Sequence, residues 1–133
     1  MLEIGSSASA TISVAGGDLA TVLNQTSQDG FPPVLATARM VGLMELAASR
    51  AMRVALGAGE LSVGVALDVS HDAATPIGAT VTAVARFVGM HGKLFVFEIS
   101  ASDAGGEIGR GTHKRAIVAA DRLVQGARRR NPE

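Results

Sequence analysis

Hydrophobic and polar positions follow two different periods on either side of residue 60. From about Thr37 to Leu56 the chain contains no proline, one glycine and a series of good helix formers, which predicts one long helix ending at the GAGE segment. After residue 60, apolar and polar residues alternate, which predicts four strands. These strands are LSVGVALDVSH, GATVTAVARFVGM, KLFVFEISASD and EIGRGTHKRAIVA.

Weaker patterns flank these elements. SATISVAG alternates like a short strand, and GGDLATVLNQTSQDG predicts a short helix capped near Asp18. Pro32 and Pro33 stiffen the approach to the long helix. The connectors DAATPIG, HG and AGG are predicted turns, and tight turns between consecutive strands favour an antiparallel sheet. The basic tail, from about residue 125 to residue 133, is expected to fray.

These elements predict an α+β fold in which about five antiparallel strands wrap around one long central helix, the hotdog arrangement. An open sheet with the helix on one face is the alternative. The length of 133 residues fits a single domain, 1–133. One thin sheet would cover so apolar a helix poorly, which predicts a homodimer or a higher assembly.

Composition narrows the classes of function. The chain has 12 basic and 12 acidic residues and no basic run interleaved with aromatics, so we expect no nucleic-acid partner. Cysteine is absent, which excludes disulfides and cysteine-based zinc sites, and we expect neither a metal nor another cofactor. The N-terminus lacks a basic signal region and no segment is apolar enough to span a membrane, so the predicted location is the cytoplasm.

Glu45 interrupts the apolar run of the long helix. The basic residues of the helix share one stripe, and Glu45 lies roughly 120° from Arg39 around the helix axis. A carboxylate placed among apolar neighbours loses solvent, which suits it to act as a general base or a nucleophile. The alternative is structural: Glu45 reaches the solvent at the rim, or it pairs with an arginine from another strand or subunit, such as Arg86 or Arg115.

Thr37 stands at the start of the same helix, where a threonine is more commonly a cap than a nucleophile. Eight residues of continuous helix place it roughly 12 Å from Glu45. If both act on one substrate, Thr37 must lie in the turn before the helix, or the pair must be completed across a dimer interface.

His71 ends the first strand after residue 60 and continues its apolar row. That row consists of the odd-numbered residues Val63, Val65, Leu67 and Val69. A histidine there is either a core residue bonded to backbone or a catalytic group held at a strand end. His91 lies in a predicted turn and is expected to be exposed, whereas the alternation around His113 is too weak to assign a face.

Three segments, ARMVGLMELAASRAM, SHDAATPIGATVT and EIGRGTHKRAIV, closely resemble the fluoroacetyl-CoA thioesterase family, a branch of the hotdog-fold acyl-CoA thioesterases. The resemblance extends over about residues 31–120. It implies a homodimeric thioesterase that hydrolyses a small acyl-CoA, and it implies Thr37, Glu45 and His71 as the catalytic residues.

The resemblance also bears on substrate binding. It implies that Phe31 helps to gate an apolar pocket. Leu46 and Ser49 stand where the fluoroacetyl enzyme is bulkier and more cysteine-like, which leaves the fold and reaction class intact and the preference for fluoroacetyl open.

The start of the long helix is the expected oxyanion site, because backbone N–H groups there lack intrahelical partners. We assign this role to the segment formed by Ala38, Arg39 and Met40. Two other functions fit the same residues: a hotdog hydratase or dehydratase acting on a 3-hydroxyacyl thioester, and a non-catalytic acyl-CoA binding module.

Overall fold

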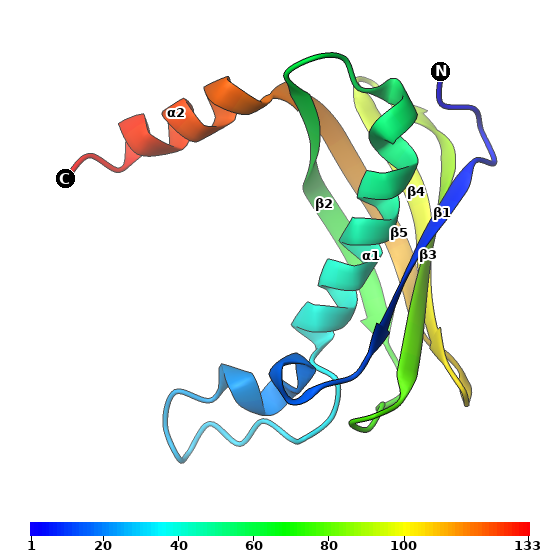
Figure 1. Cartoon of the computed structure of the whole chain (residues 1–133), viewed down its shortest axis with the longest axis vertical. Coiled ribbons are helices and arrows are strands. Elements are labelled where there is room, and N and C mark those ends of the chain that lie inside the picture. The colour runs from blue at the N-terminus through cyan, green and yellow to red at the C-terminus, as the bar shows by residue number, and fades with distance from the viewer.

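The computed structural model describes residues 1–133, and its five-stranded antiparallel sheet curls around one long helix (Figure 1). The strands are β1 (Ser7–Ser13), β2 (Glu60–His71), β3 (Thr80–His91), β4 (Leu94–Asp103) and β5 (Gly106–Ala119). The helices are α1 (Thr37–Met52) and α2 (Ala120–Arg130), with the 3₁₀ turns η1 (Gly16–Asp18), η2 (Ala20–Leu23) and η3 (Arg53–Ala55). The predicted α+β hotdog arrangement is confirmed.

The strand order in the sheet is β1-β3-β4-β5-β2, and every neighbouring pair is antiparallel. β3, β4 and β5 are joined by tight hairpins, and Gly92 takes the positive φ of 61° that the first of these turns needs. β2 and β3 are not neighbours, so the DAATPIG segment makes no hairpin and carries the chain from the β2 edge towards β3 inside the sheet. The sheet therefore has two open edges, β1 and β2.

α1 lies in the concave face of the sheet and fills it with an apolar stripe (Figure 1). Its buried residues recur at three- and four-residue intervals: Met40, Leu43, Met44, Ala47, Ala48, Ala51 and Met52. The strands that face it contribute alternate residues, among them Val81, Ala83, Ala85, Phe97, Ile99 and Ala101. Burying one leucine or methionine side chain stabilises the fold by about 1.5–3 kcal/mol, so this stripe fixes the rotation of α1 about its axis.

A bulge in β2 changes which of its residues face α1. The pairing with β5 shifts register between Gly64 and Ala66, which leaves Val65 without a partner. Before the bulge the inward residues are Ser62 and Gly64, and after it they are Leu67, Val69 and His71. The predicted row of odd-numbered residues is therefore correct for the second half of the strand and wrong for Val63, whereas Val65 is the unpaired residue of the bulge.

Three predicted segments differ from the structure. α1 ends at Met52 and continues as η3 instead of running unbroken to Leu56, and the short helix predicted near Asp18 is a pair of 3₁₀ turns. The tail, expected to fray, forms α2, because an acidic residue in its first turn and three arginines in its last turn complement the helix dipole. α2 projects away from the sheet and buries none of its residues (Figure 1). Neither helix combines the length and the hydropathy needed to cross a bilayer.

Candidate active site

Thr37 and His71 form a hydrogen-bonded pair where the start of α1 meets the end of β2. Thr37 Oγ1 lies 2.7 Å from His71 Nδ1. The N-cap of α1 is Ala36, whose side chain makes no capping hydrogen bond, so the Thr37 hydroxyl is used for the histidine and not as a helix cap. The second ring nitrogen of His71, Nε2, is buried and has no hydrogen-bond partner in the protein. A buried polar atom without a partner is costly in free energy and typical of a functional site.

Backbone contacts hold this pair together. The Leu35 N–H donates to the carbonyl of Thr75 at 2.9 Å, which ties the segment before α1 to the loop after β2. The Asp72 N–H donates to the carbonyl of Ile108 at 2.7 Å and continues the pairing of β2 with β5 past His71. These backbone hydrogen bonds fix the segment that precedes Thr37 and the segment that follows His71, so the positions of both side chains are fixed.

A mainly apolar cavity of about 330 Å³ opens beside the pair. Its lining residues are Ala20, Leu23, Phe31, Pro32, Val34, Leu35, Thr37, Ala38, His71, Asp72, Ala73 and Ala74. Phe31 is 43% exposed at the rim, and its backbone N–H donates to Asn24 Oδ1 at 3.0 Å. The cavity is at the small end of ligand sites, which suits a short acyl group.

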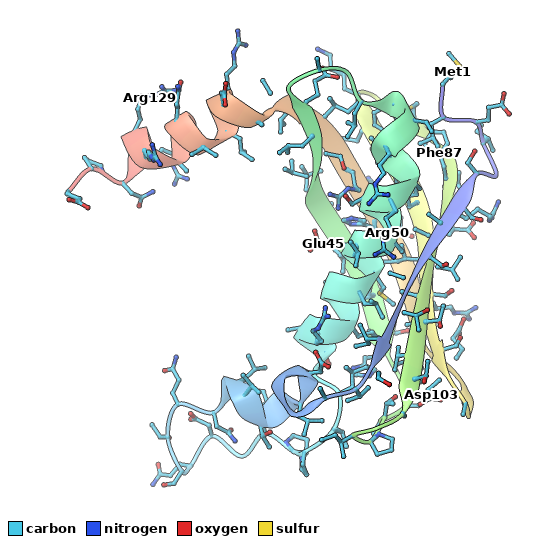
Figure 2. All side chains as sticks on the ribbon, viewed as in Figure 1. Met1, Glu45, Arg50, Phe87, Asp103 and Arg129 are labelled. Carbon is cyan, nitrogen blue, oxygen red and sulfur yellow. The ribbon has the colours of Figure 1, made fainter.

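Glu45 lies in the middle of α1, beside β2 (Figure 2). Its Oε2 is 3.5 Å from Nη1 of Arg115, so Glu45 makes the ion pair with Arg115 that the sequence allows, and this pair does not decide between a structural and a catalytic role. Arg86, the other arginine considered, pairs with Glu98 on the outer face of the sheet. The Glu45 side chain is 44% exposed, more than its apolar helical neighbours suggest, and Glu45 also borders a cavity of about 190 Å³.

Arg115 is nearly completely buried under this carboxylate. Its Nε donates to Ser62 Oγ at 2.9 Å, and its Nη2 donates to the Ser62 carbonyl at 2.8 Å. Burial lowers the pKa of Arg115, and the neighbouring Glu45 carboxylate opposes that shift. Because the guanidinium stays protonated in proteins, Arg115 is a fixed positive charge facing Glu45.

His113 completes the cluster and is 1% exposed. Burial is the main cause that lowers the pKa of His113, and the charge of Arg115 adds to it. The alternation around His113 left its face unassigned, but pairing with β2 and β4 puts it on the inner face of β5, opposite Leu67 and Phe97. A usable signal is the row of two glycines, His113, Arg115 and Ile117 at every second position, because Gly109 makes room for Met40 of α1 and Gly111 for the neighbouring backbone of β2.

The first turn of α1 offers two free N–H groups. The N–H groups of Arg39 and Met40 both donate to the carbonyl of Ala36 at 3.0 Å, whereas those of Thr37 and Ala38 have no hydrogen-bond acceptor in the protein. Of the four residues predicted to bind substrate, Phe31 and Ala38 line the cavity, and Arg39 and Met40 do not.

Arg39 and Met40 have other contacts that explain their absence from the cavity. Arg39 Nε donates to Asp18 Oδ1 at 2.8 Å, and the backbone N–H of Ala15 and this arginine together hold the pKa of Asp18 below its usual value. The Met40 side chain is fully buried, with its sulfur packed over Gly109. Both residues therefore fix α1 in place.

The two groups of polar residues are separated within one chain. Thr37 is the first residue of α1 and does not lie in the preceding turn, so eight helical positions put it roughly 12 Å from Glu45. The first of the two arrangements that the sequence allows, with Thr37 in the turn before the helix, is therefore wrong. A larger hollow of about 510 Å³ lies on the outer face of the sheet among Arg86, Glu98, Glu107 and Arg110. None of the three predicted catalytic residues lines it.

Comparison with known proteins identifies the family. A family model named FlK, fluoroacetyl-CoA-specific thioesterase, matches residues 18–121. The chain belongs to this family. A fluoroacetyl-CoA thioesterase of Streptantibioticus cattleyicolor is 45% identical over 102 residues, which are 77% of this chain and 73% of that protein. The family match ends at Asp121, so nearly all of α2 lies outside it.

Solved structures agree with the family assignment. A structure of the fluoroacetyl-CoA thioesterase FlK superimposes with a TM-score of 0.92 at 37% identity and covers 99% of both chains. A thioesterase superfamily member from Thermus thermophilus superimposes with a TM-score of 0.84 at 26% identity, over 97% of this chain and 93% of that chain. The curled sheet around one helix is thus shared with enzymes named as thioesterases.

Proposed function

We propose that this protein is an acyl-CoA thioesterase that hydrolyses a small acyl-CoA to the free acid and CoA. The observation that carries the proposal is the Thr37–His71 pair beside an apolar cavity at the N-terminus of α1. Membership of the fluoroacetyl-CoA-specific thioesterase family supports it. A thioester carbonyl bound in this cavity would lie beside the Thr37–His71 pair and beside the free backbone N–H groups at the start of α1.

The free N–H groups of Thr37 and Ala38 are the proposed oxyanion donors. An oxygen nucleophile adds to the acyl carbon, the carbonyl oxygen becomes an oxyanion, and the carbon–sulfur bond then breaks with its electron pair leaving on the CoA sulfur. A helix N-terminus favours negative charge through its unpaired donors and its dipole. A thiolate is stable near neutral pH compared with an alkoxide, so the leaving group needs little help from an acid.

Glu45 is the proposed base or nucleophile, and it acts on the substrate held by the other protomer of a homodimer. As a base it takes a proton from the attacking water; as a nucleophile it forms an anhydride that water then cleaves. Thr37 orients the reacting groups, and His71 uses its unpartnered Nε2 to assist the attacking water. Both routes consume one water and give the same products.

The exposed surface supports a dimer. β2 is an open sheet edge of 12 residues, and unprotected edges of this length are uncommon in monomers. Val65 and Leu67 on this strand are 49% and 37% exposed, and Leu46 on α1 is 39% exposed. A two-fold axis between two copies would pair these surfaces with themselves and bury the apolar side chains.

A complementation experiment tests the shared site. Glu45→Gln and His71→Ala chains, each carrying a different affinity tag, are co-expressed and the mixed dimer is purified. If each site uses Glu45 of the partner subunit and His71 of its own, one of the two sites is intact and the mixed dimer regains about half of the wild-type activity. A mixed dimer as inactive as both parents would mean that each site lies within one chain.

Thiol release from a panel of short, branched, aromatic and halogenated acyl-CoAs tests the activity itself. Release well above the uncatalysed rate is expected for at least one short acyl-CoA. Hydration of crotonyl-CoA without thiol release would identify a hydratase, and binding without either reaction would identify a binding module.

The cytoplasmic location of the protein stays a prediction.

A further inference from the structure

The hydrogen bonds of His113 determine its protonation state. Its Nδ1 lies 3.0 Å from the carbonyl oxygen of Ala66, which can only accept, so Nδ1 carries a proton. Its Nε2 lies 3.0 Å from Nη1 of Arg115, which can only donate, so Nε2 carries none. His113 is therefore neutral, in the single tautomer that these two partners allow.

Arg115 depends on this acceptor. Three of its nitrogens are occupied: Nε and Nη2 by Ser62, and Nη1 by His113 Nε2. The same Nη1 is the atom nearest to Glu45, at 3.5 Å. His113 and Ser62 together hold the guanidinium plane, and only the His113 contact acts on the nitrogen that faces the carboxylate.

We propose that His113 is a positioning residue for Glu45: its unprotonated Nε2 orients the Arg115 guanidinium, and that guanidinium determines where the Glu45 carboxylate lies. The inference rests on the proposed catalytic role of Glu45. Glu45 is 44% exposed and makes no other hydrogen bond in the protein, so Arg115 is its one fixed point of attachment. A long side chain held at one point loses its orientation when that point moves.

Protonation of His113 should release this arrangement. An imidazolium would carry a proton on Nε2, facing Nη1 of Arg115. Both groups would then be positively charged hydrogen-bond donors, so the hydrogen bond between them would be lost. The groups that face His113 are Arg115 on its own strand, Glu45 on α1, the Ala66 carbonyl on β2 and the apolar Phe97 on β4. Only Glu45 favours the protonated form by its charge, and burial opposes it more strongly. Acidification should therefore lower turnover through His113 before the fold is lost.

Kinetics of two substitutions separate positioning from packing. His113→Phe keeps a ring and removes both hydrogen bonds, so we expect kcat to fall on the order of 10-fold to 100-fold with KM changed by less than about threefold. His113→Gln keeps a carbonyl oxygen that can accept from Arg115 and cannot titrate, so it should recover most of kcat and lose the His113 contribution to the acidic limb of the pH–kcat profile. His91→Gln, in the exposed β3–β4 hairpin, is the matched control and should leave the profile unchanged. Equal kcat in the Phe variant and the wild type, at matched folded fraction, would overturn the proposal.

Nuclear magnetic resonance of the imidazole nitrogens tests the same inference without substrate. The expected spectrum has a protonated Nδ1 and an unprotonated Nε2 for His113 at neutral pH. Glu45→Gln should lower the pKa of His113 further, because the lost carboxylate favours the imidazolium. An Nε2–H tautomer, or a His113 pKa that is the same in the wild type and the Glu45→Gln variant, would contradict the positioning role. If these spectra are as expected and no acyl-CoA is hydrolysed, the linkage of His113 to Glu45 stands and the proposed thioesterase function fails.

Discussion

Thr37 Oγ1 lies 2.7 Å from Nδ1 of His71, although 34 positions of the chain separate the two residues. The contact joins the first residue of α1 to the last residue of β2. It removes the threonine from the common role of a helix cap and leaves His71 Nε2 as the buried atom without a partner. The geometry is that of a hydroxyl–imidazole dyad with one open nitrogen.

Substitution of this pair should affect turnover more than binding. His71→Ala removes both ring nitrogens, and we expect kcat to fall on the order of 10² to 10⁴ with a smaller rise in KM. Thr37→Ser should retain most activity because it keeps the hydroxyl, and Thr37→Val should not. Steady-state thiol release measures all three, with His91→Ala as the control. A rise in KM alone would assign His71 to uniform substrate binding.

Glu45→Gln keeps the size of the side chain and removes its charge. Because the group acts as base or nucleophile in the proposed reaction, turnover should fall on the order of 10² to 10⁴. The carboxylate is 44% exposed, but its loss leaves the buried Arg115 guanidinium without its counter-charge, so the melting temperature should fall while the protein stays folded. Glu98→Gln, at the exposed ion pair with Arg86 on the outer sheet face, is the control. Near-normal thiol release by a folded Glu45→Gln protein would reduce Glu45 to a structural residue.

Sequence patterning predicted the elements well because each depends on local periodicity. The strands after residue 60 and α1 were located within a few residues, since alternation and helix formers act over short windows. The bulge at Val65 was missed, because one extra residue inverts the facing of the strand without altering its composition. Gly64 was the only local hint of it.

Part of the candidate site can be predicted from the sequence for the same reason. Glu45 and His71 are ionisable groups in apolar rows of the sequence, and Arg115 is one of the two arginines that the sequence offers as a partner of Glu45. The orientation of His113 depends on the pairing of β5 with two other strands. Arg39 is held by its ion pair with Asp18, and Met40 packs over Gly109, so neither lines the cavity. These contacts join distant segments, so no local pattern indicates them.

Phe31 at the cavity rim should control which acyl groups are accepted. Its side chain is 43% exposed and lines the apolar cavity, so Phe31→Ala should widen the opening without loosening the core. We expect the ranking of kcat/KM among acyl-CoAs to change more than the activity on the best substrate. A panel of acyl-CoAs that differ in length and branching measures this. A uniform decrease for every substrate would show that Phe31 only packs.

Gly64 provides a steric test of the Glu45 position. A Cβ at this residue would lie 2.8 Å from Glu45 Oε2 and 2.8 Å from His113 Cε1, and no carbon is found that close to such atoms without displacement. Gly64→Ala should therefore displace both the flexible Glu45 carboxylate and the buried His113 ring that orients Arg115, lower kcat on the order of 10-fold to 100-fold and reduce stability. Gly126→Ala, where nothing lies within 4 Å, is the control. Unchanged kcat in a folded Gly64 variant would mean that the positions of Glu45 and His113 are not critical.

The buried neutral His113 should make stability depend on pH. Burial lowers its pKa in the folded state below the ordinary value of 6.5, so between these two pKa values the unfolded chain binds more protons than the folded chain. The stability that His113 contributes is therefore complete above about pH 6.5 and is lost as the pH falls towards the folded-state pKa. Asp18, whose pKa is also lowered, begins to add its own loss only near its ordinary value of 3.8.

Urea unfolding at a series of pH values tests this assignment. Between about pH 4 and pH 6.5, the free energy of unfolding of the wild type should decrease on acidification, and His113→Gln should flatten that decrease because glutamine does not titrate. The slope is compared and not the absolute stability, since the substitution also changes packing. His91→Gln, at an exposed hairpin, should keep the wild-type slope. An equal slope in the His113→Gln protein would mean that His113 is already protonated in the folded state, which the two hydrogen bonds of its ring do not allow.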